Sequence, residues 1–171
     1  MISEFEIIRR YFAQRARTAV LGVGDDCALV KASKGMTLAL STDMLLAGRH
    51  FLPGADPEQL GHKSLAVNIS DLAAMGADPR WALLAIALPK VDENWLAAFS
   101  KGFFRLARRF EMELIGGDTT RGPLTISITV VGEVPEKLAL RRDAARAGEE
   151  VWLSGSTGEA ALGLAHIKGR V

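Results

Sequence analysis

Apolar residues recur at helical spacing in several stretches of this chain. Ser3 and Glu6 have the spacing of a capping box, and the apolar residues after them repeat at intervals of three and four, which predicts a helix over residues 3–17. A proline at the start and a glycine just past the end bound a second predicted helix, 57–75. Asp92 is placed to cap a third helix, which is apolar along one side.

Shorter apolar runs predict strands between these helices. The run at 81–88 is too short and too uniformly apolar for a surface helix, so we expect a buried strand there. The runs at 27–30 and 36–42 flank a glycine-bearing turn and predict a hairpin, while residues 43–56 lack a steady period and predict a loop. Further strands are expected at 114–115, 125–134 and 151–153. This order indicates an α+β or α/β fold, with a mixed sheet and helices on one face.

The chain length is close to that of one domain, since 171 residues compare with a usual domain of roughly 150. Residues 1–135 contain the helices and strands of one complete domain. Residues 136–171 follow as a linker, a short strand and a helix at 159–167. We expect this last segment to be the truncated start of a second α/β domain.

Composition and charge exclude several classes of protein. Apolar residues make up 49% and charged residues 24%, which is typical of a globular domain and not of a disordered chain. The net charge of +1 gives no overall attraction to nucleic acid or to an anionic membrane. The single cysteine, Cys27, excludes an internal disulfide, and no secretory or membrane-spanning apolar run is present. A cytoplasmic protein is the expectation.

One predicted helix carries polar groups in unusually apolar surroundings. Its residues 65–75 are apolar almost all the way round, so we expect this stretch to be buried. Asn68 and Asp71 lie three residues apart and therefore on one face. A buried ionised carboxylate is costly unless a cation or several donors meet it. Either a bound metal ion or a set of backbone N–H groups and a nearby arginine would satisfy Asp71.

Three further aspartates lie at the boundaries of predicted strands. Asp26, Asp43 and Asp118 have glycine or hydroxyl-bearing neighbours. Each alone is typical of a turn or a cap, but together with Asp71 they predict a shared cation site. Oxygen ligands of this kind suit Mg²⁺, and the histidines lack the close pairing of a zinc site.

Two of these aspartates also lie beside glycines that would let backbone N–H groups approach a phosphate. No Walker or Rossmann pattern is present. Arg121 and Arg142 are candidates to contact a polyphosphate, with solvated surface arginines as the alternative. No arrangement of serine or cysteine with histidine and aspartate supports covalent catalysis.

Four strings carry a resemblance to a known family. They are "GVGDDCALV", "LALSTDMLLAGRHF", "HKSLAVNISDLAAMGADPRWALLAIALP" and "LIGGDTTRGPLTISITVVGEVP". In this order they resemble the N-terminal half of bacterial thiamine-monophosphate kinases, within the wider superfamily of aminoimidazole-ribonucleotide synthetases. The resemblance covers nearly the whole chain, and its Ser-Thr-Asp and Gly-x-His-Phe strings distinguish the kinases from the rest of the superfamily.

The resemblance implies ATP-dependent phosphorylation of thiamine monophosphate to thiamine diphosphate, with several Mg²⁺ ions held by aspartates. By motif position, the implied metal-binding residues are Asp26, Ser41, Thr42, Asp43, Asp71 and Asp118. His50 matches a residue that contacts the substrate, and Gly117, Asp118 and Arg142 match positions at the nucleotide. A family tyrosine at the nucleotide would fall near Lys101, where this chain has no aromatic residue.

The resemblance also implies an assembly and a missing part. The family pairs the N-terminal sheets of two copies into a barrel across a homodimer, and a second domain of similar size completes its site. Because the acceptor is itself a phosphate, direct in-line transfer without a phosphoenzyme is expected. Two alternatives remain open at this point: a related ATP-dependent synthetase, and a non-catalytic dimerisation or metal-binding module.

Overall fold

The computed structural model describes residues 2–171, and the chain divides after Leu140 into two compact units. The first unit is built on a four-stranded sheet in the order β1-β4-β2-β3. Its strands are β1 (Met36–Leu46), β2 (Asp78–Leu88), β3 (Glu113–Arg121) and β4 (Thr125–Pro135). Strands β2 and β3 are parallel, and β4 is antiparallel to β1 and to β2. The sheet is therefore mixed and open, with β1 and β3 at its edges.

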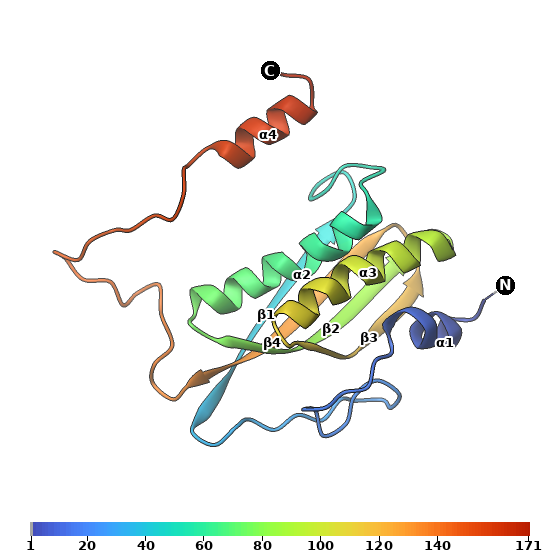
Figure 1. Cartoon of the computed structure of the whole chain (residues 1–171), viewed down its shortest axis with the longest axis horizontal. Helices are drawn as coiled ribbons and strands as arrows, with labels where there is room; N and C mark the ends of the chain where they lie inside the picture. The colour runs from blue at the N-terminus through green and yellow to red at the C-terminus, as the bar shows by residue number, and fades with distance from the viewer. Residues whose placement is uncertain (1) are drawn as a thin grey trace. The chain divides into compact units, whose positions relative to one another are not determined.

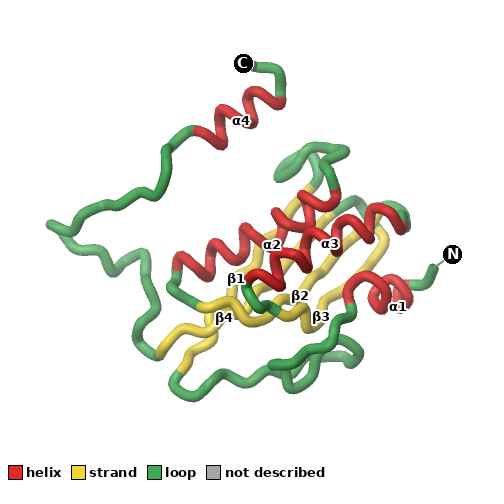
Figure 2. Tube along the Cα trace, in the orientation of Figure 1, coloured by secondary structure: helices red, strands yellow, loops and turns green. Residues whose placement is uncertain are grey.

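Two long helices cover one face of this sheet (Figures 1 and 2). They are α2 (Pro57–Ala74) and α3 (Glu93–Arg109). The side chain of Asp56 caps α2 by accepting a hydrogen bond from the Gln59 N–H at 2.8 Å, and Asp92 caps α3 by accepting one from the Trp95 N–H at 3.1 Å. These starts confirm the two helices expected from the sequence.

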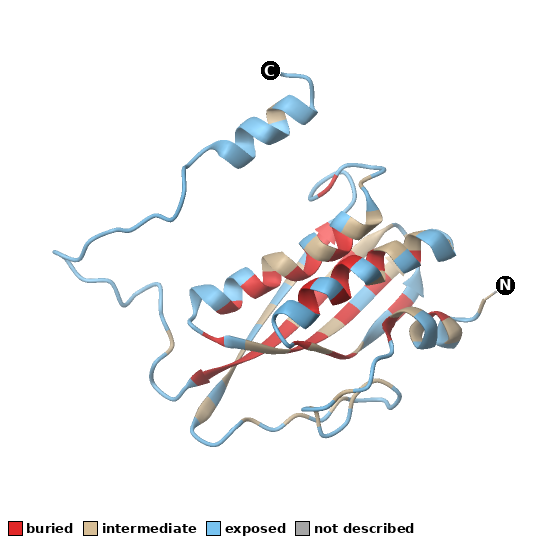
Figure 3. Cartoon of the chain, viewed as in Figure 1, coloured by how far each residue is buried: buried red, intermediate tan, exposed pale blue. Residues whose placement is uncertain are grey.

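The core of this unit fills the space between the sheet and the two helices. Figure 3 shows buried residues on the inner sides of α2 and α3 and along the central strands. The helices touch backbone to backbone at Gly61 and Gly102. A Cβ atom added at Gly102 would lie 1.9 Å from the Glu58 carbonyl oxygen, and one at Gly61 would lie 2.1 Å from that of Phe99. Only glycine allows this close approach.

The predicted hairpin is wrong, because β1 pairs with β4 instead. Residues 27–30 form no strand, and their one ladder contact is an isolated bridge between Leu29 and Leu21. The partner of β1 lies some ninety residues later in the chain, from Met36 opposite Pro135 to Leu46 opposite Thr125. All eleven residues of β1 are paired with β4, so this pairing forms a longer hydrogen-bonded ladder than a four-residue hairpin arm could. It also extends β1 through Leu46, so Asp43 lies in a strand and not in a loop.

The predicted helix over 3–17 is shorter in the structure. It consists of α1 (Glu4–Ile7) and a wide π-helical turn, η1 (Ile8–Phe12), after which Ala13 is extended. The next residues run across the sheet, where a carboxylate from β3 binds their backbone N–H groups. Hydrogen bonding to a distant strand thus replaces the last helical turns.

The second unit contains one helix, α4 (Glu159–Ile167), as the sequence predicted. The strand expected at 151–153 is absent, and these residues are exposed. Within residues 2–171, no helix has the length and apolar character needed to cross a membrane.

Candidate functional site

An open cavity of about 800 Å³ lies beside the edge strand β3. Its walls include residues 23–28 of the N-terminal segment and residues 114–119 of β3, with apolar side chains from α1 and η1. Asp26 and Asp118 both line it, together with Gly117. The structure thus brings two of the predicted metal-binding aspartates to one cavity.

The loop that carries Asp26 is closed at its base by backbone hydrogen bonds. Leu21 and Leu29 form an antiparallel bridge, and the Val20 N–H also donates to the Leu29 carbonyl at 2.8 Å. At the tip, the Asp26 N–H donates to the Asp25 carboxylate at 2.8 Å. The base is therefore fixed, and the tip presents acidic side chains to the cavity.

Asp118 lies on the face of the sheet that the long helices leave open. In the strand register it is aligned with Ala85 of β2, which faces Ser127 of β4, and Ser127 faces Met44 of β1. The buried residues that meet the helices occupy the alternate positions. The preceding residue, Gly117, has a φ of 144° and lies so close to the Leu84 carbonyl that a Cβ would sit 1.8 Å from its oxygen.

A second group of candidates lies on the other side of the sheet, between β1 and α2. The Ser41 hydroxyl donates to the Asp71 carboxylate at 2.6 Å. The Asp43 N–H donates to the Asn68 side-chain oxygen at 3.0 Å, and the Asn68 amide donates to the Ser64 carbonyl at 2.9 Å. These bonds join the middle of β1 to one side of α2.

The expectation of a buried carboxylate on α2 is wrong. Asn68 is fully buried, but Asp71 is exposed, because the sheet and α3 cover only one side of the helix. An exposed carboxylate needs no buried counter-charge. Asp71 is therefore a candidate metal ligand because it lies beside Ser41 and Asp43, and not because it is buried.

The pleat of the sheet separates the predicted metal ligands into two sets. Ser41 and Asp43 belong to the face covered by α2, with Asp71, whereas Thr42 and Asp118 belong to the open face. Thr42 shares a 2.7 Å hydrogen bond with Thr129 on that face. Within residues 2–171 no group of three or more His, Cys, Asp or Glu side chains is close enough to hold a metal ion.

The remaining candidates are His50 and Arg142. His50 lies in a tight turn after β1, where its Nδ1 accepts a hydrogen bond from the Leu46 N–H at 3.0 Å. Lys63 of α2 donates to the His50 carbonyl at 2.6 Å. With Nδ1 used as an acceptor, the neutral ring carries its proton on Nε2 and is a donor there. Arg142 belongs to the second unit and is exposed.

Two buried or half-buried glutamates were missed by the sequence reasoning. Glu113 opens β3 and accepts hydrogen bonds from residues 17–19, and Glu133 of β4 binds Ser33. Burial raises the pKa of Glu113, but the hydrogen bonds from Arg17, Thr18 and Ala19 outweigh it and hold the pKa below its usual value of 4.5. For Glu133 the available signal was an acid within the largely apolar run 130–134, whereas Glu113 lies in a strand with several other polar residues and gave no such signal.

A known protein family matches the part of the chain that forms this sheet and its two long helices. Residues 24–134 match the family described as AIR synthase related protein, N-terminal domain. The chain belongs to this family. The match spans all four strands and both long helices of the AIR synthase related domain, up to the next-to-last residue of β4.

Within the AIR synthase related family, this chain is similar to thiamine-monophosphate kinases. The thiamine-monophosphate kinase of Salmonella typhimurium is 51% identical over 172 residues, covering 98% of this chain and 53% of that protein. The crystal structure of the same kinase from Stenotrophomonas maltophilia K279a has a TM-score of 0.83 at 46% identity, covering 90% of this chain and 49% of that one. A structure of AaThiL complexed with AMPPCP and TMP has a TM-score of 0.72 at 34% identity, covering 81% and 45%.

These relatives confirm the resemblance carried by the four sequence strings. They also set its extent, because the chain spans about half the length of the relatives it matches.

Proposed function

We propose that this chain is part of an ATP-dependent kinase that converts thiamine monophosphate to thiamine diphosphate. The observation that carries the proposal is the 51% identity to a thiamine-monophosphate kinase over 98% of the chain. A structure of a similar protein is that of AaThiL complexed with AMPPCP and TMP, which supports a nucleotide and a thiamine phosphate as the ligands.

The candidate ligand residues fit Mg²⁺ by their chemistry. The donor set is carboxylates and hydroxyls, which are the hard oxygen ligands that Mg²⁺ takes, and Ser41 and Asp71 are already in contact at 2.6 Å. We propose that Asp26, Thr42 and Asp118 on one side of the sheet, and Ser41, Asp43 and Asp71 on the other, hold these ions. Bound Mg²⁺ would neutralise charge on the two phosphate-bearing reactants.

The protein's own groups then orient the two reactants. We propose that His50 donates from Nε2 to the phosphate of the thiamine substrate, since Nδ1 is occupied by the Leu46 N–H. Gly117 lets the backbone beside Asp118 approach the nucleotide, and Arg142 supplies positive charge to it. A phosphate acceptor needs no strong general base, so the γ-phosphoryl group is transferred directly and in line. Inversion at a chiral γ-phosphorus is the expected result, and retention would contradict direct transfer.

We also propose that the working molecule is a homodimer whose sheets pair into a barrel. The open face of β1 exposes Leu40 at 66% and Met44 at 56%, an apolar surface that a second copy would cover. In one copy Asp71 and Asp118 lie on opposite sides of the sheet, so a cluster using both would draw on two copies. Mixing Asp71→Asn and Asp118→Asn chains should then restore part of the Mg²⁺-dependent nucleotide binding that each lacks alone. No restoration would contradict a shared site.

The test of the function compares this chain with a version extended to the length of its relatives. We expect thiamine diphosphate from the extended protein, and little or none from residues 1–171, because this chain spans only about half the length of its relatives. Asp71→Asn should abolish activity in the extended protein while leaving it folded. If the Asp71→Asn protein made thiamine diphosphate at the rate of the unsubstituted protein, the proposed role of the Asp71 carboxylate would be contradicted.

A further inference from the structure

Glu113 makes an unusual number of hydrogen bonds to a segment far away in the sequence. Its carboxylate accepts from the Arg17 N–H at 2.7 Å, from the Thr18 N–H at 3.1 Å, from the Thr18 hydroxyl at 2.9 Å and from the Ala19 N–H at 3.3 Å. Three consecutive backbone N–H groups therefore converge on one side chain. Charge-assisted bonds of this kind are stronger than neutral ones.

The same segment is also attached to the second strand of the sheet. The Thr18 hydroxyl accepts a hydrogen bond from the indole N–H of Trp81 at 3.0 Å. Trp81 is 1% exposed and packs with Ile115 and Val131 in a small cluster on the open face, against which Ala19 is also packed. The segment is thus fixed to β3 by a carboxylate and to β2 by an indole.

This attachment lies immediately before the acidic loop. Two residues after Ala19, Leu21 bridges to Leu29, and the loop between them carries Asp26 into the cavity that Asp118 also lines. Glu113 and Asp118 belong to the same strand, five residues and about 16 Å apart along β3. The strand that presents one aspartate therefore also holds the base of the loop that presents the other.

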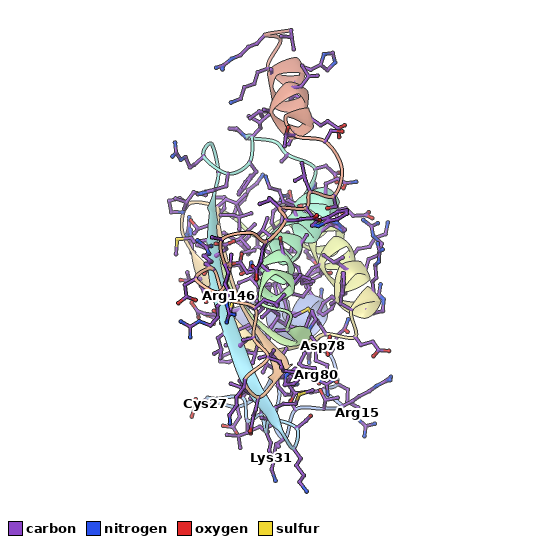
Figure 4. The ribbon with its side chains drawn as sticks, turned by 90° about the vertical axis from the view of Figure 1, so that its left-hand side faces the viewer. Arg15, Cys27, Lys31, Asp78, Arg80 and Arg146 are labelled. Atoms are coloured by element: carbon purple, nitrogen blue, oxygen red, sulfur yellow. The ribbon has the colours of Figure 1, made fainter. Side chains whose placement is uncertain are left out.

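The far end of the segment is held in a similar way. Ser33 donates to the Glu133 carboxylate from its N–H at 2.6 Å and from its hydroxyl at 3.0 Å, and Arg80 lies 3.3 Å from the same carboxylate. In Figure 4, Arg80 is labelled together with Cys27 and Lys31 of the segment between the two attachments. Two carboxylates from neighbouring parts of the sheet therefore bracket the loop.

We propose that Glu113 is a positioning residue for the metal and nucleotide site: it fixes the loop so that Asp26 faces Asp118 across the cavity. This inference rests on the proposed function, because it assigns a purpose to the loop geometry. Glu113 itself contacts neither reactant and acts through Asp26.

The first experiment measures loop order without any ligand. Cys27 is the only cysteine and is exposed next to Asp26, so a nitroxide attached to it reports the motion of the loop. In Glu113→Gln the side-chain NH₂ would face backbone N–H groups, and we expect faster nitroxide motion and at least tenfold faster exchange of the Thr18 and Ala19 amides. Glu111→Gln is the matched control, since Glu111 is exposed and outside these hydrogen bonds. Unchanged motion and exchange in Glu113→Gln would overturn the proposal.

A second pair of variants tests the same contact if Glu113→Gln fails to fold. Thr18→Val removes the hydroxyl that joins Glu113 to Trp81, whereas Thr18→Ser keeps it. We expect faster loop motion in the valine variant and wild-type motion in the serine variant. Equal nitroxide motion in the two variants would contradict the proposed role of this hydrogen bond.

The second experiment separates positioning from a general structural role. Calorimetry measures Mg²⁺-dependent AMPPCP binding for wild type, Glu113→Gln, Asp26→Asn and the double variant. We expect each single substitution to weaken binding at least tenfold, and the double variant to bind within twofold of Asp26→Asn, because Glu113 acts through Asp26. Losses that multiply would overturn the positioning role.

The two experiments distinguish failure of this inference from failure of the proposed function. If neither the unsubstituted chain nor its version extended to the length of its relatives binds AMPPCP with Mg²⁺, the proposed function is contradicted, and the role of Glu113 in that site with it. The nitroxide and amide-exchange results would still decide whether Glu113 orders the loop.

Discussion

The crossing of α2 and α3 at Gly61 and Gly102 gives a quantitative test of the fold that supports the site. In Gly102→Ala the new Cβ would lie 1.9 Å from the Glu58 carbonyl oxygen, about 1.5 Å short of the roughly 3.4 Å of an ordinary contact. The obstacle is backbone, so the helices must separate along their whole contact. Alanine for glycine favours a helix by about 1 kcal/mol, while overpacking of a core costs about 1–3 kcal/mol or more.

Because a rigid carbonyl blocks the new methyl group, we place the cost above the usual range and expect a net loss of about 2 kcal/mol. For a unit of this size that corresponds to a fall in Tm of about 8 °C. Circular dichroism during thermal and urea unfolding measures it, with an unchanged urea m-value as the sign that only stability has altered.

Gly163→Ala is the matched control, because a Cβ at Gly163 in α4 meets no atom within 4 Å. It should leave the unfolding of the first unit unchanged. Combining Gly61→Ala with Gly102→Ala should cost less than the two single losses together, since one separation of the helices relieves both clashes. A Gly102→Ala protein that unfolds at or above the wild-type temperature would refute the backbone contact.

Three further predictions address the hydrogen bonds around the candidate ligands. The pKa of Glu113 is lowered in the folded protein, so its hydrogen bonds stabilise the fold fully at pH values above the usual glutamate pKa of 4.5. This stabilisation is lost as the pH falls through the lower pKa of the folded state. The difference in unfolding free energy between wild type and Glu113→Gln, measured by urea titration, should therefore shrink between pH 7 and pH 3. Asn68→Leu removes the acceptor for the half-buried Asp43 N–H and should lower the unfolding free energy by about 1–3 kcal/mol, whereas an unchanged value would show that water replaces it. Ser41→Ala removes the 2.6 Å donor to Asp71, and we expect weaker Mg²⁺-dependent nucleotide binding by calorimetry with an unchanged Tm.

Local signals in the sequence predicted the helices better than the sheet. Pro57 and the glycine after residue 75 bounded α2, and Asp92 capped α3, so local start and stop signals were sufficient to place both helices. The pairing of β1 with β4 joins segments some ninety residues apart, which no local pattern encodes. The adjacent 27–30 run was the nearer partner in sequence and the wrong one.

The sequence also could not predict on which side of the sheet each candidate ligand lies. The motifs named Asp26, Asp118, Ser41 and Asp71 as one set of ligands, and the structure places Asp26 with Asp118 at one cavity and Ser41 with Asp71 elsewhere. The face on which each residue lies depends on register, and β3 shifts register against β2 between Ala82 and Leu83. A shift of one residue reverses the face of everything after it, so the division of the ligands was not readable from spacing.

That division has a consequence for mixtures of intact and damaged chains. If carboxylates from both sides of the sheet serve one reaction centre, each centre draws its parts from two polypeptides. A chain that folds but lacks both Asp71 and Asp118 would then disable both centres of the pair that it forms with an intact chain. Such a variant would be dominant-negative in a cell that also makes the normal protein.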